Sequence, residues 1–386
     1  MRFGSTGYAA QWWECLARGV VTPIRYGHDV TDIQTVRGAI APSTLGRVLF
    51  HEHLLMVLTG PWHRGGLVER AEFERQQVQA AVSALSGLRE LGFRTVVDLS
   101  PYGDAGRDAH GHNVRLLKDI AEQSGINVVT GTATYRQEFS PQWVLDANID
   151  ELTDRFITDA DTGIADTGIR AGIIGEQPTS ENLVTDHDDK GLRAAARAAA
   201  STGLALATHT THGTMALEQI DIITSEGVEP SRVVIGHMDN HTELDYLRRV
   251  LDTGVSIGFD SIGKQFWDAR TPYRIPATNG ETLKRSLFRS DETRADWLAT
   301  LVREGYRDQV VLSHDLVAAQ VALNPETHGR HGYTYIGAVF TELLQQRDVT
   351  PDDLDVLLHA NPARLLQPTG RPWHARTGAH GVTEAW

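Results

Sequence analysis

The amino-acid sequence predicts a parallel (β/α)8 barrel that follows an N-terminal extension, and three observations carry this prediction. Short apolar runs alternate with longer amphipathic stretches along most of the 386 residues. Eight of these runs have the length and character of strands. Finally, no linker rich in proline, glycine or serine divides the chain into separate units. One domain therefore accounts for the pattern better than two.

The strand candidates are short and largely apolar, as expected for strands buried on both faces of a parallel sheet. They lie at residues 48–53, 95–99, 127–131, 170–176, 204–209, 232–237, 255–260 and 309–315. Because these runs alternate with helical stretches, each strand should return to the next through a helix, which closes a barrel.

The helical candidates carry apolar residues at helical spacing, and a glycine follows each of them closely. They lie at residues 67–91, 191–202, 214–226, 242–251 and 294–304. With the strands, they predict an extension over residues 1–32, a barrel over 33–367 and a C-terminal tail over 368–386.

Composition excludes several classes of partner. The chain has 36 Lys and Arg against 50 Asp and Glu, a net charge of -14, which argues against nucleic acid and anionic membrane surfaces. The single cysteine, Cys15, suits a reducing compartment, so we expect a cytoplasmic protein. No apolar run reaches the roughly 18 residues that a membrane span needs. Trp12 and Trp13 could dock on the barrel or form a subunit interface, so a homodimer is possible.

Metal-binding residue types recur where the predicted strands end, which is where (β/α)8 barrels place their active sites. Side chains two apart in a strand point the same way, so the histidines that end the first strand should lie side by side. The candidate ligands are His51, His53, Glu176, His209, His237 and Asp315. Six nitrogen and oxygen donors exceed the needs of one tetrahedral zinc and match two ions about 3.5–4 Å apart. The sequence therefore predicts two divalent ions, with Zn²⁺ as first choice.

Two carboxylates have distinct expected roles in this centre. Glu176 enters opposite the strand of His51 and His53, so it should bridge the ions. Asp315 should bind one ion and accept the proton of the water that the metals activate. His314 should face away from this site, because adjacent strand residues point to opposite faces.

Several motifs together carry a resemblance to the phosphotriesterase family of the amidohydrolase superfamily, over about residues 33–367. The motifs are T-V-R-G at 35–38, L-G-R-V-L-F-H-E-H-L-L at 45–55, A-D-T-G-I-R-A-G-I-I at 165–174, T-H-T at 208–210, I-G-H-M-D at 235–239, S-H-D at 313–315 and N-P-A-R-L-L at 361–366. The resemblance implies a metal-dependent hydrolase with a binuclear centre. It further implies that His51, His53 and Asp315 hold a buried ion. His209 and His237 would hold an exposed one.

The chain departs from that pattern at two places. Many members bridge the metals with a carboxylated lysine, whereas Glu176 is similar to the phosphotriesterase homology proteins and the acyl-taurine-hydrolysing branch. Members that hydrolyse phosphotriesters carry a titratable aspartate and histidine where this chain has Asn240 and Ser261. We therefore expect hydrolysis of an ester, lactone or amide. The alternatives are an organophosphate triester hydrolase and, from another class, a non-catalytic metal-binding barrel.

The substrate pocket should be built by the loops after the strands. Tyr135, Asp260 and Arg274 are the candidate substrate contacts. An aromatic wall with an arginine suits a small, partly apolar molecule that bears a carbonyl or an anionic group.

Overall fold

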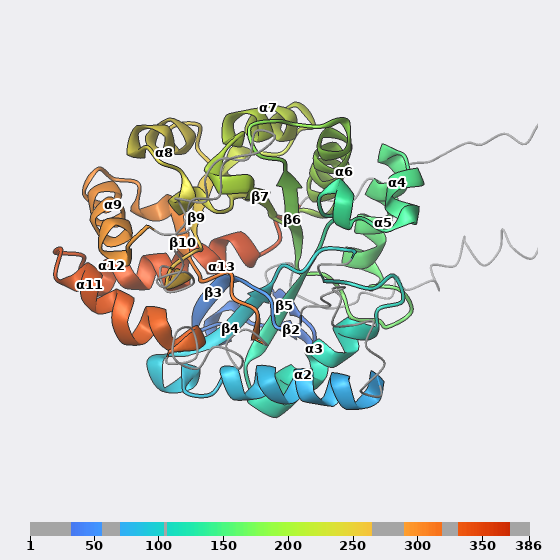
Figure 1. The fold of residues 1–386 in the computed structure, drawn as a ribbon, viewed down its shortest axis with the longest axis horizontal. Coiled ribbons are helices and arrows are strands. Elements are labelled where there is room, and N and C mark those ends of the chain that lie inside the picture. The colour runs from blue at the N-terminus through green and yellow to red at the C-terminus, as the bar shows by residue number, and fades with distance from the viewer. Residues whose placement is uncertain (1–31, 56–69, 104–105, 265–288, 319–330, 371–386) are drawn as a thin grey trace, which may run out of the picture.

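The computed structural model describes residues 32–55, 70–103, 106–264, 289–318 and 331–370 of the chain. Eight parallel strands form one sheet in the order β3 to β10, and helices surround it (Figure 1). The sheet and its helices match a (β/α)8 barrel, so the predicted fold is confirmed. Trp12, Trp13 and Arg274 lie outside the described residues.

Each predicted strand overlaps one strand of the barrel. The strands are β3 (Arg47–Glu52), β4 (Phe93–Asp98), β5 (Asn127–Thr132), β6 (Ile173–Thr179), β7 (Leu206–Thr210), β8 (Val233–Ile235), β9 (Ser256–Phe259) and β10 (Val310–Leu312). Several predicted runs extend beyond these bounds because their last residues belong to the loops that leave the barrel. The polar side chains at those ends therefore lie partly on strands and partly on loops.

The helices of the outer layer are α2 (Arg70–Ala84), α3 (His112–Ser124), α4 (Gln142–Asp146), α5 (Ile149–Asp161), α6 (Asp186–Thr202), α7 (Ala216–Ser225), α8 (Leu244–Leu251), α9 (Asp291–Arg303), α11 (Thr341–Gln345), α12 (Pro351–Asp355) and α13 (Asn361–Leu366). Helix α6 begins earlier than predicted because Thr185 and Asp188 form a capping box before its apolar pattern starts. Among the helices of the described ranges, none combines the length and the apolar character needed to cross a bilayer.

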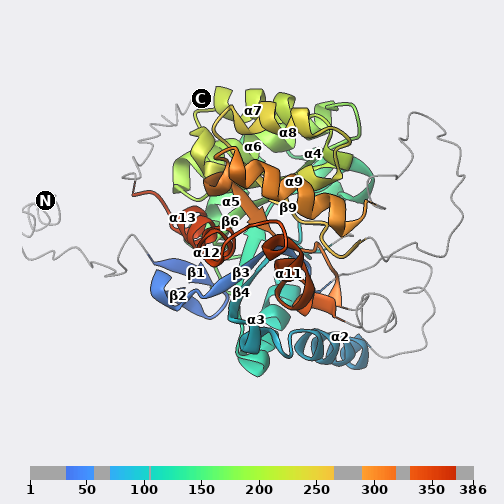
Figure 2. The ribbon, with the colours of Figure 1, turned by 90° about the vertical axis from the view of Figure 1, so that its left-hand side faces the viewer.

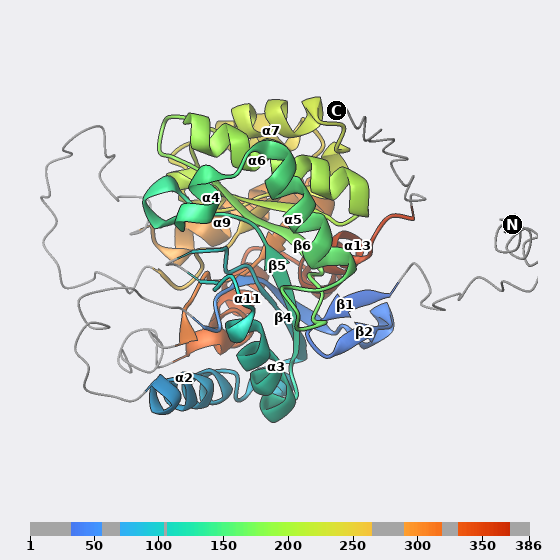
Figure 3. The same ribbon diagram turned by 90° about the vertical axis from the view of Figure 1, so that its right-hand side faces the viewer.

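The antiparallel hairpin of β1 (Ile33–Thr35) and β2 (Gly38–Ile40) was not predicted. It lies beside the barrel near α13 (Figures 2 and 3). The N–H of Val36 donates to the carbonyl of Val128 at 2.9 Å, near the start of β5. A side chain on Gly172 would meet the Gln34 carbonyl, since its Cβ would lie 2.5 Å from that oxygen. The hairpin therefore packs at the N-terminal end of the strands.

Side chains alternate between the barrel interior and the helix layer along each strand. Val48 and Phe50 of β3 point inward and pack in one buried cluster with Val129 and Val311. Leu49, which lies between Val48 and Phe50, packs in the other cluster with the helices. This alternation sets which residues at the strand ends can face the interior.

The barrel closes where β3 meets the segment after β10. The N–H of Asp315 donates to the carbonyl of His51 at 3.0 Å, and the N–H of His53 donates to that of Leu316 at 2.9 Å. The N–H of Ala318 donates to the carbonyl of His53 at 3.2 Å. The closing seam therefore runs through three of the candidate metal ligands.

Candidate metal centre

Two irregularities in strand pairing turn candidate ligands toward the interior. In β3, Leu49 pairs with Val96 and Glu52 with Asp98, so β3 carries one extra residue between these pairs. This bulge shifts the alternation by one, and His51 follows Phe50 into the interior. A similar shift in β6, between Ile174 and Gln177, surrounds Glu176. The bulges, rather than regular alternation, aim these side chains.

Glu176 lies among all four candidate imidazoles. Its Oε2 atom is 3.1 Å from Nε2 of His51, 3.0 Å from Nδ1 of His209 and 3.6 Å from Nε2 of His237. Its Oε1 atom is 3.5 Å from Nε2 of His53. The carboxylate therefore lies within reach of imidazoles on both sides of the cluster, as a bridging ligand requires.

Asp315 lies on the side of the cluster next to the seam. Its Oδ1 atom is 3.0 Å from Nε2 of His53 and 3.9 Å from Nε2 of His51. Its other oxygen pairs with the ammonium of Lys264, a buried residue that the sequence analysis did not select. Asp315 has a φ of 53°, so it occupies the left-handed region where its strand has already ended.

Three groups of side chains each bring their ligand atoms within 4.8 Å of one another and could hold a metal ion. One is His51, His237 and Asp260, and the other two contain the six candidate ligands. Of these two, the first is His51, His53 and Asp315, and the second is Glu176, His209 and His237. The structure thus brings together all six residues chosen from the sequence. Glu176 belongs to the second group and also lies close to His51 and His53 of the first.

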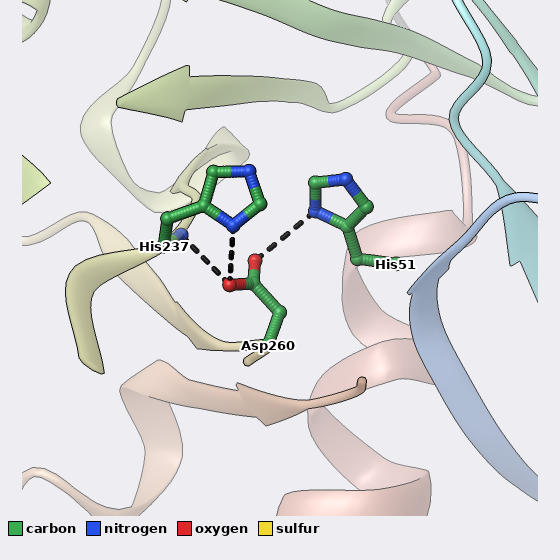
Figure 4. A group of neighbouring side chains, drawn as sticks. All are labelled: His51, His237 and Asp260. Carbon is green, nitrogen blue, oxygen red and sulfur yellow. Dashed lines mark hydrogen bonds and ion pairs between the residues drawn. The ribbon is translucent and has the colours of Figure 1, made fainter. Parts of the chain in front are cut away.

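Asp260 lies behind two of the imidazoles (Figure 4). Its Oδ2 atom is 3.0 Å from Nδ1 of His51, and its Oδ1 atom accepts the N–H of His237 and lies 2.8 Å from Nδ1 of the same residue. Gly258 leaves room for it, since a Cβ there would lie 2.4 Å from Oδ2. Both carboxylate oxygens are engaged, so this geometry favours orientation of histidines over contact with substrate.

His53 is oriented by a residue that the sequence analysis missed. Its Nδ1 atom is 3.0 Å from the hydroxyl of Ser100, whose N–H donates to Asp98 at 3.2 Å. The other oxygen of Asp98 accepts the N–H of Leu54 at 2.8 Å. Ser100 lies two residues beyond Asp98, at the end of the second strand run, and this position was the available signal.

Burial and the neighbouring charges shift the pKa values of several groups in the cluster. Burial by itself lowers the pKa of His51, but Glu176 and Asp260 outweigh it and raise that pKa well above the ordinary value. Burial is likewise outweighed at His237, where Asp260 raises the pKa to about 10. Burial and the adjacent His237 lower the pKa of His209 to about 4. Burial opposes ionisation of Glu176, yet His51 and His209 hold its pKa well below the usual range.

The donor atoms fit metal ions. Nε2 of His51 is buried and has no hydrogen-bond partner within the described part of the chain, although Glu176 lies beside it. Nε2 of His237 and Nδ1 of His209 are only 2.8 Å apart, and two lone pairs at that distance need a cation or a proton between them. Because Asp260 accepts from Nδ1 of His51 and His237, their Nε2 atoms are free to coordinate.

Of the three predicted substrate contacts, Tyr135 lies next to the cluster, Asp260 contacts two of its histidines, and Arg274 lies outside the described residues. The ring of Tyr135 lies edge-on to His209 with centroids 5.4 Å apart, at the border of the cluster. Burial and the charge of Glu176 raise the pKa of its hydroxyl well above the ordinary value, so it stays a proton donor. The amide of Asn240 donates to the hydroxyl of Ser261 at 2.8 Å.

Comparison with known proteins places this site in a family. The profile described as the phosphotriesterase family matches residues 31–366. The chain is 30% identical to the phosphotriesterase homology protein of Escherichia coli over 322 residues, 83% of this chain and 98% of the relative. A crystal structure of the E. coli protein, with phosphate in its active site, superposes with a TM-score of 0.68 over 84% of this chain and 99% of that chain.

Two other relatives carry the names of hydrolytic enzymes. An aryldialkylphosphatase of Saccharolobus solfataricus is 27% identical over 86% of this chain and 98% of its own length. An N-acetyltaurine hydrolase of Dictyostelium discoideum is 30% identical over 75% of this chain and 73% of its own. These names argue against the alternative of a non-catalytic metal-binding barrel. The chain belongs to the phosphotriesterase family, and it is a metal-dependent hydrolase of that family.

Proposed function

We propose that this hydrolase binds two zinc ions and cleaves a lactone, ester or amide bond in a small molecule. The observation that carries the proposal is the convergence of six donors from five strands of the barrel. In this proposal His51, His53 and Asp315 hold one ion, His209 and His237 hold the other, and the donor between them is Glu176. Bound zinc would polarise the electrophilic oxygen and lower the pKa of water enough for attack at neutral pH.

The chain's own residues prepare the site for this chemistry. Asp260 orients His51 and His237 through their Nδ1 atoms. Lys264 and His53 outweigh burial and hold the pKa of Asp315 well below the usual range, so this side chain is ionised. As a carboxylate beside the ions it would accept the proton of the attacking water. The half-buried side chain of Tyr135 lies beside His209, and its hydroxyl is a proton donor that could bind the substrate carbonyl.

A carbonyl substrate ranks above a phosphotriester because of the pair formed by Asn240 and Ser261. These side chains bond to each other at 2.8 Å and occupy the positions at which a proton relay was expected for triester hydrolysis. Neither side chain titrates near neutral pH. The name of the Dictyostelium relative supports an amide substrate, whereas that of the Saccharolobus relative supports a phosphoester.

The test combines metal analysis with a substrate panel. Protein loaded with zinc and freed of excess metal should hold close to two ions per chain. The panel should contain aliphatic lactones, aryl esters, N-acyl amino acids, N-acetyltaurine and a dialkyl aryl phosphotriester. We expect the best carbonyl substrate to exceed the triester in kcat/KM by more than about tenfold. Triester turnover within tenfold would reverse the ranking, and less than one zinc with full activity would refute the two-metal centre.

We further propose a cytoplasmic protein whose partner is its small-molecule substrate, without nucleic acid or membrane. The net charge of -14 and the single cysteine support this part of the proposal. A homodimer is the proposed assembly, and light scattering on the full chain tests it.

A further inference from the structure

Glu52 lies between His51 and His53 in the chain, but its side chain points away from the metal centre. Its exposed fraction is 0%, so its carboxylate lies wholly inside the protein. A buried carboxylate is costly unless hydrogen bonds satisfy it. The mechanism proposed above does not use Glu52, so its partners must explain why it is there.

The hydrogen-bond donors to the Glu52 carboxylate lie on the segment that carries Asp315. Oε1 accepts the hydroxyl of Ser313 at 2.8 Å and the N–H of His314 at 2.9 Å, and it lies 2.8 Å from Nδ1 of His314. Oε2 accepts the N–H of Leu316 at 2.8 Å. We call Glu52 with Ser313, His314 and Leu316 the Glu52 clasp.

The tautomer of His314 follows from its other partner. The N–H of Ile336 donates to Nε2 of His314 at 3.2 Å, so Nε2 carries no proton. Nδ1 must therefore carry it and donate to Glu52. His314 faces away from the cluster, and every contact of the Glu52 clasp uses a donor on the segment and an acceptor on Glu52.

The Glu52 clasp connects the two segments that carry one candidate metal group, namely β3 with His51 and the segment with Asp315. The hydroxyl of Ser313 also accepts the N–H of His51 at 2.8 Å, so it joins the backbone of one candidate ligand to Glu52. Asp315 is flanked on both sides by residues that donate to Glu52, and its left-handed φ of 53° is costly for an aspartate without such support. β3 and the segment after β10 are thereby held at a set distance.

We propose that Glu52 is a positioning residue that holds Asp315 against His51 and His53, so that one of the two metal positions is formed before an ion arrives. This inference rests on the proposed function, because it concerns the ligands of that centre. Glu52 acts through Asp315 and touches neither substrate nor the ligand atoms of the cluster.

The test replaces Glu52 by glutamine and measures zinc retention. The new side-chain amide would turn an N–H toward either Leu316 or the donors at Oε1, so the Glu52→Gln change leaves donors facing each other. We expect zinc affinity at one of the two positions to fall about 10- to 100-fold, as for other residues that orient ligands. Equilibrium dialysis against graded chelator measures this without any activity assay.

A matched control is Asp159→Asn. Asp159 is also a fully buried carboxylate, and it accepts from the hydroxyls of Tyr102 and Thr132, both at 2.7 Å, and pairs with Arg155. This variant should lower the thermal midpoint and leave zinc retention as in the wild type. Equal zinc retention in the Glu52 and Asp159 variants would overturn the inference.

His314 provides a second test if the Glu52→Gln protein does not fold. In His314→Asn the side-chain amide nitrogen is bonded to Cγ, as Nδ1 is in histidine, so an N–H donor remains. In His314→Phe no donor remains. We expect the asparagine variant to retain zinc better than the phenylalanine variant. Wild-type retention in both would contradict the Glu52 clasp. A wild-type protein that holds no zinc would instead refute the proposed function itself, and the inference with it.

Discussion

The two ends of the barrel use the same inward positions of the same strands for opposite purposes. At the N-terminal end these positions carry apolar side chains, and Ile33, Leu45 and Leu365 pack against them. At the carboxyl end they carry imidazoles and carboxylates. The buried Arg232 shows the contrast most clearly, because its guanidinium donates to fixed carbonyls such as those of Arg364 and Leu365.

The two ends of the barrel differ in how their buried charged groups are satisfied. Backbone carbonyls accept from both terminal nitrogens of Arg232, so this end contributes stability rather than binding. Within the described residues, the carboxyl end keeps Nε2 of His51 without a hydrogen-bond partner and places charged groups against one another. A bound cation would stabilise that arrangement, so metal binding should add to the stability of this end. Changes at the two ends should therefore have separable effects.

The largest expected effect is on catalysis, from Asp315→Ala at the carboxyl end. The change removes one candidate ligand and the proposed acceptor of the water proton, so kcat/KM on the best substrate should fall by about a thousandfold or more. Steady-state kinetics after zinc reconstitution measures the loss. Circular dichroism of the metal-free protein checks that the variant is folded, and activity within tenfold of wild type would break the assignment.

The next effect is on stability, from Leu365→Ala at the opposite end. Leu365 is fully buried in the cluster that fills the barrel interior. Loss of its side chain leaves a cavity and should reduce the free energy of unfolding by about 2–5 kcal/mol. Denaturant titration measures this, while zinc content and kcat/KM of the folded fraction should stay within about twofold. A parallel loss of zinc would mean that the ends are not independent.

A smaller effect on metal affinity is expected from Asp260→Asn. The amide cannot accept from Nδ1 of both His51 and His237, so at least one imidazole loses its orientation. Zinc affinity should fall about 10- to 100-fold with the fold intact. Competition with a chromogenic chelator measures it. If affinity were unchanged while KM rose, Asp260 would contact substrate, as the sequence alone had suggested.

The smallest effect is the release of protons when zinc binds. The pKa values of His51, His53 and His237 are raised in the metal-free protein, because nearby carboxylates outweigh burial, so these side chains carry protons at neutral pH. Zinc must displace them, and apparent affinity should rise with pH. Calorimetry in buffers of different ionisation enthalpy should show release of about one proton or more per chain. The Leu365→Ala protein should release the same number, and no release would contradict these pKa directions.

Much of the site could be predicted because strand ends are readable from local patterns. The apolar run before His51 and the alanine-rich helix before Leu204 mark where strands begin and end, and barrels gather such ends at one rim. Glu52 and Lys264 could not be selected in this way. Their partners are distant in the chain, as Glu52 and Ser313 are, and no local spacing encodes those contacts.

The sequence by itself determined that eight strands alternate with helices and that metal-binding side chains end five of them, since periodicity and strand ends are local properties. Only the tertiary structure decided which of these side chains face the interior, because the bulges in β3 and β6 arise from pairing with neighbouring strands. It also decided that Glu52 closes the seam beside Asp315, because ring closure joins the first barrel strand to the last.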